Sequence, residues 1–218
     1  MAKKARSRKQ ARKESPEISE LLVLELQEIH SAENQLSRML PRVLKAVESE
    51  KLGQMLELRQ EQGERLIEEV EACLEELEET PGRKKNVAAE GLINDMREHI
   101  QELEAGPALD AVLIAAVQKT EHYCIAAWGT AKALGDATDS KATVKSMERA
   151  LQEGKELDEQ LTQLALDEIT PALQAQAGGG EEEEEEGDDS GDEGEDDEEI
   201  KMPTRSNRKG GGERRVSR

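Results

Sequence analysis

The chain has 218 residues, of which 50 are Asp or Glu and 30 are Lys or Arg, and it contains no Phe, one Trp and one Tyr. Aromatic packing therefore cannot dominate a core, and aliphatic and alanine side chains must supply it. No run of about 18 apolar residues occurs, and no apolar segment follows the charged start MAKKARSRKQARKES, which argues against a membrane span and a cleaved secretory signal.

These features indicate a soluble cytoplasmic protein. The two cysteines, Cys73 and Cys124, lack a CxxC spacing, so neither a disulfide framework nor a cysteine zinc site is indicated. We expect two reduced thiols.

Charge and composition divide the chain into three parts. Residues 1–14 carry seven Lys or Arg against one Glu and are expected to form a disordered basic tail. Residues 15–175 contain the apolar periodicity that a folded domain needs. In residues 176–218 a block with 15 acids between Glu181 and Glu199 precedes a basic end, and this composition predicts a second disordered tail.

Helix signals follow one another through the middle part, and strand signals are missing. Ser15 before Pro16 indicates a helix start, and apolar residues recur every seven positions, which predicts a first helix over about 16–50. Similar patterns predict helices over 52–79, 87–104 and 107–134, and a last helix capped by Asp139 or Ser140 that runs to about residue 173. Four long helices and one short one predict an all-α fold, an antiparallel four-helix bundle with a short crossover helix.

Helix phase, at about 100° per residue, indicates which polar side chains face the core. Glu33 lies in an apolar column on the first helix, and Arg59 lies near the centre of the apolar stripe on the second. Glu121 and Cys124 fall within the apolar stripe of the helix predicted over 107–134, whereas the neighbouring His122 points away from it. With Asp158 on the last helix, the predicted inward polar set is Glu33, Arg59, Glu121 and Asp158.

Three segments carry a resemblance to a known family: GPALDAVLIAAVQKTEHYCIAAWGTAKALG, IHSAENQLSRMLPRVLKA and TPGRKKNVAAEGLI. In this order they resemble the YciE/YciF family of ferritin-like, stress-associated bacterial proteins over residues 18–165. The resemblance implies a four-helix bundle with a carboxylate-rich dinuclear metal site. It places acids at Glu33, Glu121 and Asp158.

The ligand set that the resemblance implies is incomplete in this chain. Arg59 and Gln62 stand where the family generally has a histidine and an acid. Cys124 and Gly154 stand where further acids are common. No Glu-x-x-His spacing, the usual helical di-iron signature, occurs in the sequence.

Three interpretations of the inward acids compete. In the first, Glu33, Glu121 and Asp158, with Cys124 as a weaker candidate, hold iron or manganese as residual ligands. In the second, the cation Arg59 neutralises buried acids and the bundle binds no metal cofactor. In the third, the acids lie at the margin of the core and reach water. The second explains the loss of ligands and the gain of an arginine together, because a metal cation beside a guanidinium would be repelled.

The function that follows is a non-catalytic, ferritin-like scaffold in stress physiology, with a degenerate di-metal site. The alternative is an enzyme with ferroxidase-like or peroxide-linked iron chemistry at a residual carboxylate site. We expect a homodimer, and basic proteins as partners for the acidic tail. Specific nucleic-acid binding is disfavoured, because the basic ends lack aromatic residues and flank an acidic block that competes with phosphate.

Overall fold

The computed structural model describes residues 17–178, and this part of the chain is helical throughout apart from its connections. The helices are α1 (Ile18–Leu44), α2 (Glu50–Glu76), α3 (Val87–Glu102), α4 (Pro107–Ala137), α5 (Lys141–Leu164) and α6 (Thr170–Gly178), with a π-helical turn (Ala165–Ile169) joining α5 to α6. No strand occurs between residues 17 and 178. The prediction of an all-α fold is confirmed.

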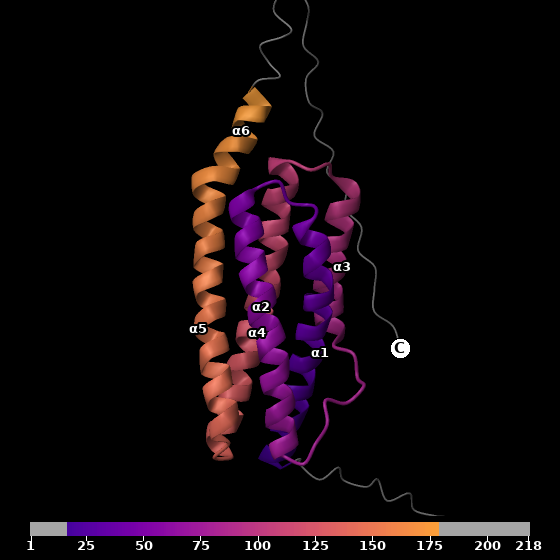
Figure 1. The fold of residues 1–218 in the computed structure, drawn as a ribbon, viewed down its shortest axis with the longest axis vertical. Helices are drawn as coiled ribbons and strands as arrows, with labels where there is room; N and C mark the ends of the chain where they lie inside the picture. Colours follow the sequence, from indigo (N-terminus) through magenta and orange to yellow (C-terminus); the bar gives the residue numbers. More distant parts are fainter. Residues whose placement is uncertain (1–16, 179–218) are drawn as a thin grey trace, which may run out of the picture. The chain divides into compact units, whose positions relative to one another are not determined.

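Four long helices, α1, α2, α4 and α5, form the bundle (Figure 1). Each packs against two of the others: α1 against α2 and α4, and α5 against α4 and α2. The short helix α3 lies along the outside, against α1 and α4. It carries the chain from the end of α2 back to the start of α4, so that α4 runs in the same direction as α2 and antiparallel to its neighbours α1 and α5. This is the predicted bundle with a crossover helix.

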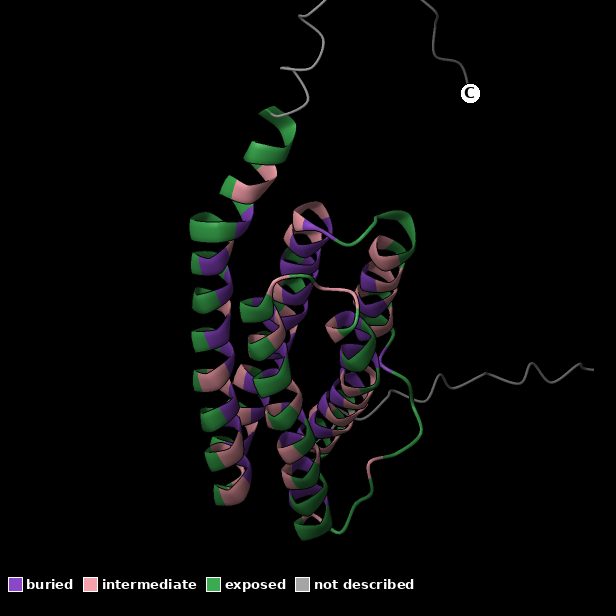
Figure 2. Cartoon of the chain, turned by 45° about the horizontal axis from the view of Figure 1, so that its top comes forward, coloured by how far each residue is buried: buried purple, intermediate pink, exposed green. Residues whose placement is uncertain are grey.

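Two apolar clusters divide the interior along the length of the bundle. One is centred on residues such as Leu40, Leu56 and Leu113, and the other on residues such as Leu26, Val70 and Trp128. Figure 2 shows the buried positions following the inner faces of the helices. The helix segments that pass from one cluster to the other, between Ile29 and Leu36 for example, carry the candidate site residues.

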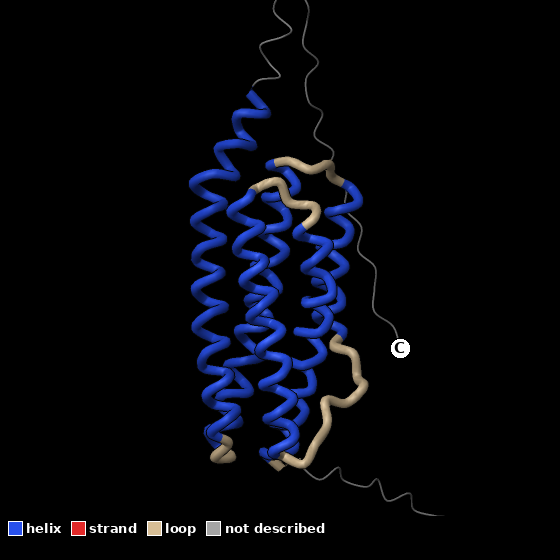
Figure 3. Tube along the Cα trace, in the orientation of Figure 1, coloured by secondary structure: helices blue, strands red, loops and turns tan. Residues whose placement is uncertain are grey.

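The predicted first boundary is wrong, because the first helix ends at Leu44 and not near residue 50. The second helix starts at Glu50, where the Ser49 side chain accepts a hydrogen bond from the Leu52 amide at 3.3 Å. The buried carboxylate of Asp110, in the first turn of α4, accepts bonds from the amides of Glu48 (3.0 Å) and Ser49 (2.8 Å). Asp110 thus fixes the loop between α1 and α2. Figure 3 draws this loop in tan at the upper end of the bundle.

The loop between α2 and α3 is anchored by Asn86. Its side chain caps α3 by accepting a bond from the Ala89 amide at 3.0 Å, and its amide nitrogen donates to the Tyr123 hydroxyl at 2.5 Å. Helix α5 has Ser140 at its N-cap position, one of the two residues expected there, although its side chain makes no capping hydrogen bond. Helix α1 begins at Ile18; the predicted cap Ser15 lies outside the described residues.

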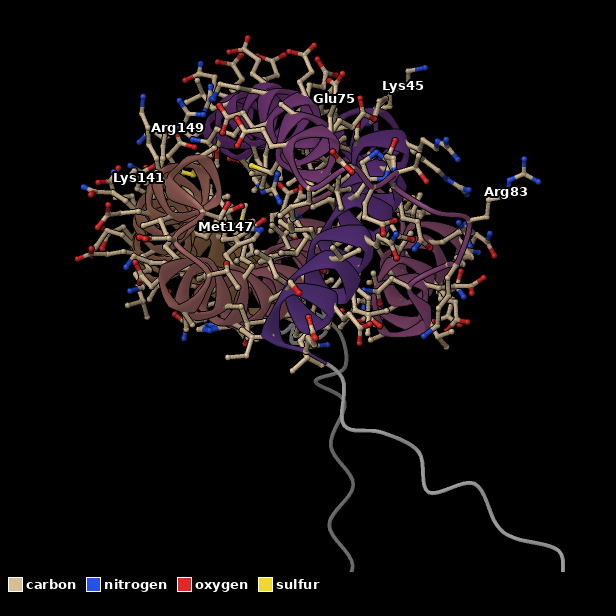
Figure 4. The ribbon with its side chains drawn as sticks, turned by 90° about the horizontal axis from the view of Figure 1, so that it is seen from below. Lys45, Glu75, Arg83, Lys141, Met147 and Arg149 are labelled. Atoms are coloured by element: carbon tan, nitrogen blue, oxygen red, sulfur yellow. The ribbon has the colours of Figure 1, made fainter. Side chains whose placement is uncertain are left out.

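Charged side chains cover the outer surface of the bundle. Viewed along the helices from below, Lys45, Glu75, Arg83 and Lys141 project outward (Figure 4). No helix within residues 17–178 combines the length and the apolar character that crossing a membrane requires. The predicted tails, 1–14 and 176–218, lie outside the described range except for residues 176–178, which end α6.

Candidate functional site

Arg59 of α2 binds two carboxylates in the centre of the bundle, one from α1 and one from α4. Its Nη2 donates to both oxygens of Glu33, at 3.1 and 3.0 Å, and its Nε donates to Oε1 of Glu121. Relative exposures are 2% for Arg59, 1% for Glu33 and 0% for Glu121. The three side chains form a buried charge cluster that joins α1, α2 and α4.

The cluster sits where the two apolar cores meet. Glu33 follows Ile29 of one core and precedes Leu36 of the other, and Arg59 and Glu121 occupy the corresponding boundary on α2 and α4. An unpaired charge could not be held there, because transfer of an ion from water into such an environment is costly. The three groups can therefore be buried only because the Arg59 guanidinium pairs with both carboxyl groups.

The electrostatics of the cluster keep Arg59 charged. Burial alone opposes the charged guanidinium, but the carboxylates of Glu121 and Glu33 outweigh it and raise the pKa of Arg59 above its ordinary value. Burial also raises the pKa of Glu121, and the charges of Glu33 and Asp158 add to this, whereas Arg59 lowers it. With two carboxylates against one guanidinium, the raised pKa of Glu121 makes it the acid that gains a proton more readily than usual.

Asp158 lies at the edge of the site and does not bind Arg59. Its side chain is 23% exposed, accepts a bond from the Gln118 amide at 3.0 Å and lies 3.3 Å from Nε2 of His122. The expectation that it points into the centre with the other acids is corrected by these contacts. His122, with 66% of its side chain exposed, faces outward as helix phase predicted.

Cys124 lies in α4 beside the cluster and is 3% exposed. Burial, followed by the charges of Glu33 and Glu121, raises the pKa of its thiol well above the ordinary value. Because the thiolate is the form that binds metals, this environment makes Cys124 a poor ligand.

Trp128 is a member of the site that sequence reasoning missed. The centroid of its indole ring lies 5.8 Å from Cζ of Arg59, within the range of a cation–π interaction. Trp128 follows Cys124 by four positions on α4, so both lie on the inner face of that helix. Trp128 was not among the predicted inward polar residues, and no sequence pattern connects it with Arg59.

Two glycines inside helices make room for the arginine and the tryptophan. A Cβ on Gly63 would lie 2.8 Å from Nη1 of Arg59 and 3.2 Å from Oε2 of Glu33. A Cβ on Gly154 would lie 2.6 Å from Cζ3 of Trp128 and 3.3 Å from Oε2 of Glu121. Where the resemblance implies an acid, at position 154, the bundle holds the six-membered ring of Trp128.

The geometry of the described residues does not match a metal centre. No three His, Cys, Asp or Glu side chains in residues 17–178 are grouped so that they could share a metal ion. The oxygens that the resemblance implies as ligands, on Glu33 and Glu121, are engaged by Arg59. The donor set does not fit a di-metal cofactor.

The fold and this site together define a four-helix bundle with a crossover helix and a buried arginine–glutamate cluster at its centre. Residues 17–174 match the family model described as "Domain of unknown function (DUF892)". The chain belongs to this family.

Individual relatives agree with this assignment. The protein YciF of Escherichia coli (strain K12) is 35% identical over 161 residues, which span 73% of this chain and 97% of YciF. The crystal structure of the Escherichia coli stress protein YciF superposes with a TM-score of 0.68, covering 72% of this chain and 99% of that one. The YcfI structure from Rhodopseudomonas palustris gives a TM-score of 0.64 at 27% identity, covering 69% and 96%.

Proposed function

We propose that this protein is a non-catalytic helical scaffold that acts in bacterial stress physiology, and that Arg59 provides the positive charge which a dinuclear metal centre would provide in a ferritin-like bundle. The observation that carries the proposal is the contact of one guanidinium with Glu33 and Glu121, at the centre of the bundle. The link to stress rests on the likeness to YciF, which is described as a stress protein.

In this proposal the cluster has a structural role and no catalytic one. Arg59 connects three of the four bundle helices where the two apolar cores meet. A guanidinium has a fixed planar array of donors and no open coordination position, so it cannot bind oxygen or peroxide as a metal does. The competing function, ferroxidase-like or peroxide-linked chemistry with iron or manganese, requires Glu33 and Glu121 to leave Arg59 and join Asp158 around a metal ion.

Metal content separates the two functions. The full chain is purified from cells supplied with iron and manganese, and bound metal is measured by mass spectrometry after gel filtration. We expect far less than one metal ion per chain. Near-stoichiometric iron or manganese that disappears in a Glu33→Gln variant would overturn the proposal.

A second variant guards against metal held outside the bundle. Residues 181–199 contain 15 acids, which can bind cations without any built site. A chain ending at residue 178 removes them. Metal that persists in Glu33→Gln and is lost on this truncation belongs to the acidic segment and leaves the proposal standing.

We further infer that the scaffold is a homodimer. Apolar side chains remain exposed at the start of α1, where Ile18 is 50%, Leu21 38% and Leu24 52% exposed. Next to them a groove of about 470 Å³ is lined by Val23, Leu24 and Leu77, among others. Light scattering coupled to gel filtration measures the mass of the assembly, and a monomer at micromolar concentration would contradict this inference.

A further inference from the structure

A small cavity lies at the seam between α2 and α5, next to the buried charge cluster but outside it. Its volume is about 10 Å³, and its walls include Arg59 and Glu69 of α2, Trp128 of α4 and Ala150 of α5. A cavity of this size accommodates about one water molecule, and a water there needs two or more polar partners.

Two buried polar atoms among the residues that line this cavity have no protein partner. They are the indole Nε1 of Trp128, which can only donate, and Oε2 of Glu69, which can only accept when ionised. Buried polar groups are rarely left without a partner, because desolvation is then uncompensated. Trp128 and Glu69, which carry this donor and this acceptor, line the same cavity, so a single bridging water there would satisfy both.

Two ion pairs formed by residues that line the cavity each join α2 to α5. Nη2 of Arg65 donates to both oxygens of Glu153, at 2.6 and 2.8 Å, and Nη2 of Arg149 pairs with Oε1 of Glu69. The side chains of Arg65 and Arg149 are 40% and 43% exposed, whereas Arg59 and Trp128 beside the same cavity are almost fully buried. Arg149 lies at the rim of the bundle (Figure 4).

We propose that this cavity is a binding site for one water molecule, which accepts a hydrogen bond from the Trp128 indole and donates one to Oε2 of Glu69. The Arg65–Glu153 and Arg149–Glu69 pairs act as the gate through which this water exchanges with solvent and through which solvent reaches Arg59. The inference concerns the neighbouring cavity, so it stands or falls independently of whether the bundle binds a metal.

The chain's single tryptophan gives a direct probe, because its indole N–H is one isolated signal in a ¹⁵N-edited NMR spectrum of the full chain. We expect a dipolar cross-peak between this proton and water, with the sign that a long-lived bound water produces. The hydroxyl of Ser146, which also lines the cavity, could relay such a signal by proton exchange. The measurement is therefore repeated on Ser146→Ala, where the cross-peak should remain.

Filling the cavity tests the location of the water. Ala150→Leu places a larger side chain in the wall of the cavity and should abolish the cross-peak to water. The indole N–H signal should stay sharp and keep the chemical shift of the folded protein. A cross-peak that survives in Ala150→Leu, or a protected indole proton in the parent chain with no cross-peak to water, would overturn the site. The parent-chain measurement decides the matter even if the variant does not fold.

The gate is tested by hydrogen exchange of the same indole proton. Loss of a partly exposed ion pair weakens the closed state by up to about 1 kcal/mol, so Arg149→Ala should speed exchange roughly two- to fivefold. Lys119→Ala is the matched control, because it removes a surface pair with Asp95 away from this seam. Equal exchange in Arg149→Ala and the parent chain would refute the gate.

Discussion

Nη2 of Arg59 lies 3.1 and 3.0 Å from the two carboxylate oxygens of Glu33, and neither side chain is more than 2% exposed. This contact buries a guanidinium and a carboxyl group together in the centre of a bundle, at a point where two apolar cores meet. Neither residue can be removed without leaving a buried charge that has lost part of its compensation.

Arg59→Met should destabilise the protein by about 3 to 5 kcal/mol at neutral pH, because Glu33 and Glu121 then remain buried without their cation. Chemical denaturation followed by circular dichroism measures the loss. Arg65→Met is a suitable control, because its ion pair with Glu153 is partly exposed and should cost no more than about 1 kcal/mol. An Arg59→Met variant as stable as the parent would contradict the charge-cluster interpretation.

The raised pKa of Glu121 predicts a specific pH dependence. A carboxyl with a folded-state pKa above its ordinary value, near 4.5, binds more protons in the folded than in the unfolded state as pH falls between the two values. Its contribution to stability is therefore greatest below the ordinary value and is lost as pH rises through the raised pKa.

The comparison that isolates this effect is the parent chain against Glu121→Gln, which cannot titrate at this position. As pH is lowered from neutral toward 4.5, the free energy of unfolding of the parent chain should increase relative to that of Glu121→Gln. In the Arg59→Met background the gain should be larger, because the cation that lowers the pKa of Glu121 is gone. Parallel pH profiles for parent and Glu121→Gln would show that Glu121 titrates at its ordinary pKa.

Gly154→Ala should destabilise the bundle by about 1 to 3 kcal/mol, because the added methyl group would sit 2.6 Å from the Trp128 ring. Gly129→Ala in α4 is the matched control: nothing lies within 4 Å of its Cβ position, so it should stabilise by roughly 0.5 to 1 kcal/mol through helix propensity. Thermal unfolding of both variants measures the difference. If the two alanine variants change the unfolding temperature by the same amount, the absence of a Cβ at Gly154 is not required for the packing of Trp128.

Introducing a metal centre should require the replacement of Trp128 in addition to the ligand substitutions that the sequence suggests. Arg59→His, Gln62→Glu, Cys124→Glu and Gly154→Glu restore the ligand types that the family resemblance implies. The carboxylate side chain introduced at position 154 would collide with the Trp128 ring, so Trp128→Leu must accompany them. We expect iron binding by calorimetry only in the fivefold variant; tight iron binding by the fourfold variant would show that Trp128 is no obstacle.

Helix periodicity predicted most of the fold and the centre of the site, because burial in a bundle follows angular position around each helix. Glu33, Arg59 and Glu121 were placed inward on that basis, and the structure brings them into contact. Asp158 lies near the edge of the apolar stripe, where phase alone does not decide between the core and its margin. Contacts with Gln118 and His122 hold it at the margin.

The features that sequence reasoning missed depend on volume and on partners far along the chain. The break at residues 45–49 was hidden because apolar residues such as Val47 continue the heptad pattern, although Ser49 is a favourable helix cap. Asp110 was not singled out, because an acid in the first turn of a helix is common and its partners lie about 60 residues earlier in the chain. Gly63 and Gly154 were the available sequence signals, because a glycine inside a helix costs stability and so indicates that a neighbouring side chain occupies the space of its Cβ. The neighbour is Arg59 for Gly63 and Trp128 for Gly154.

The contact between Gly154 and Trp128 also constrains the order in which this sequence could change. An acid cannot be introduced at position 154 while the indole ring is present, and removal of the indole takes away the aromatic face beside Arg59. Substitution of Arg59 strands two carboxylates. Single substitutions toward the ligand set that the family resemblance implies should therefore lower stability at positions 59 and 154, so that several positions would have to change together.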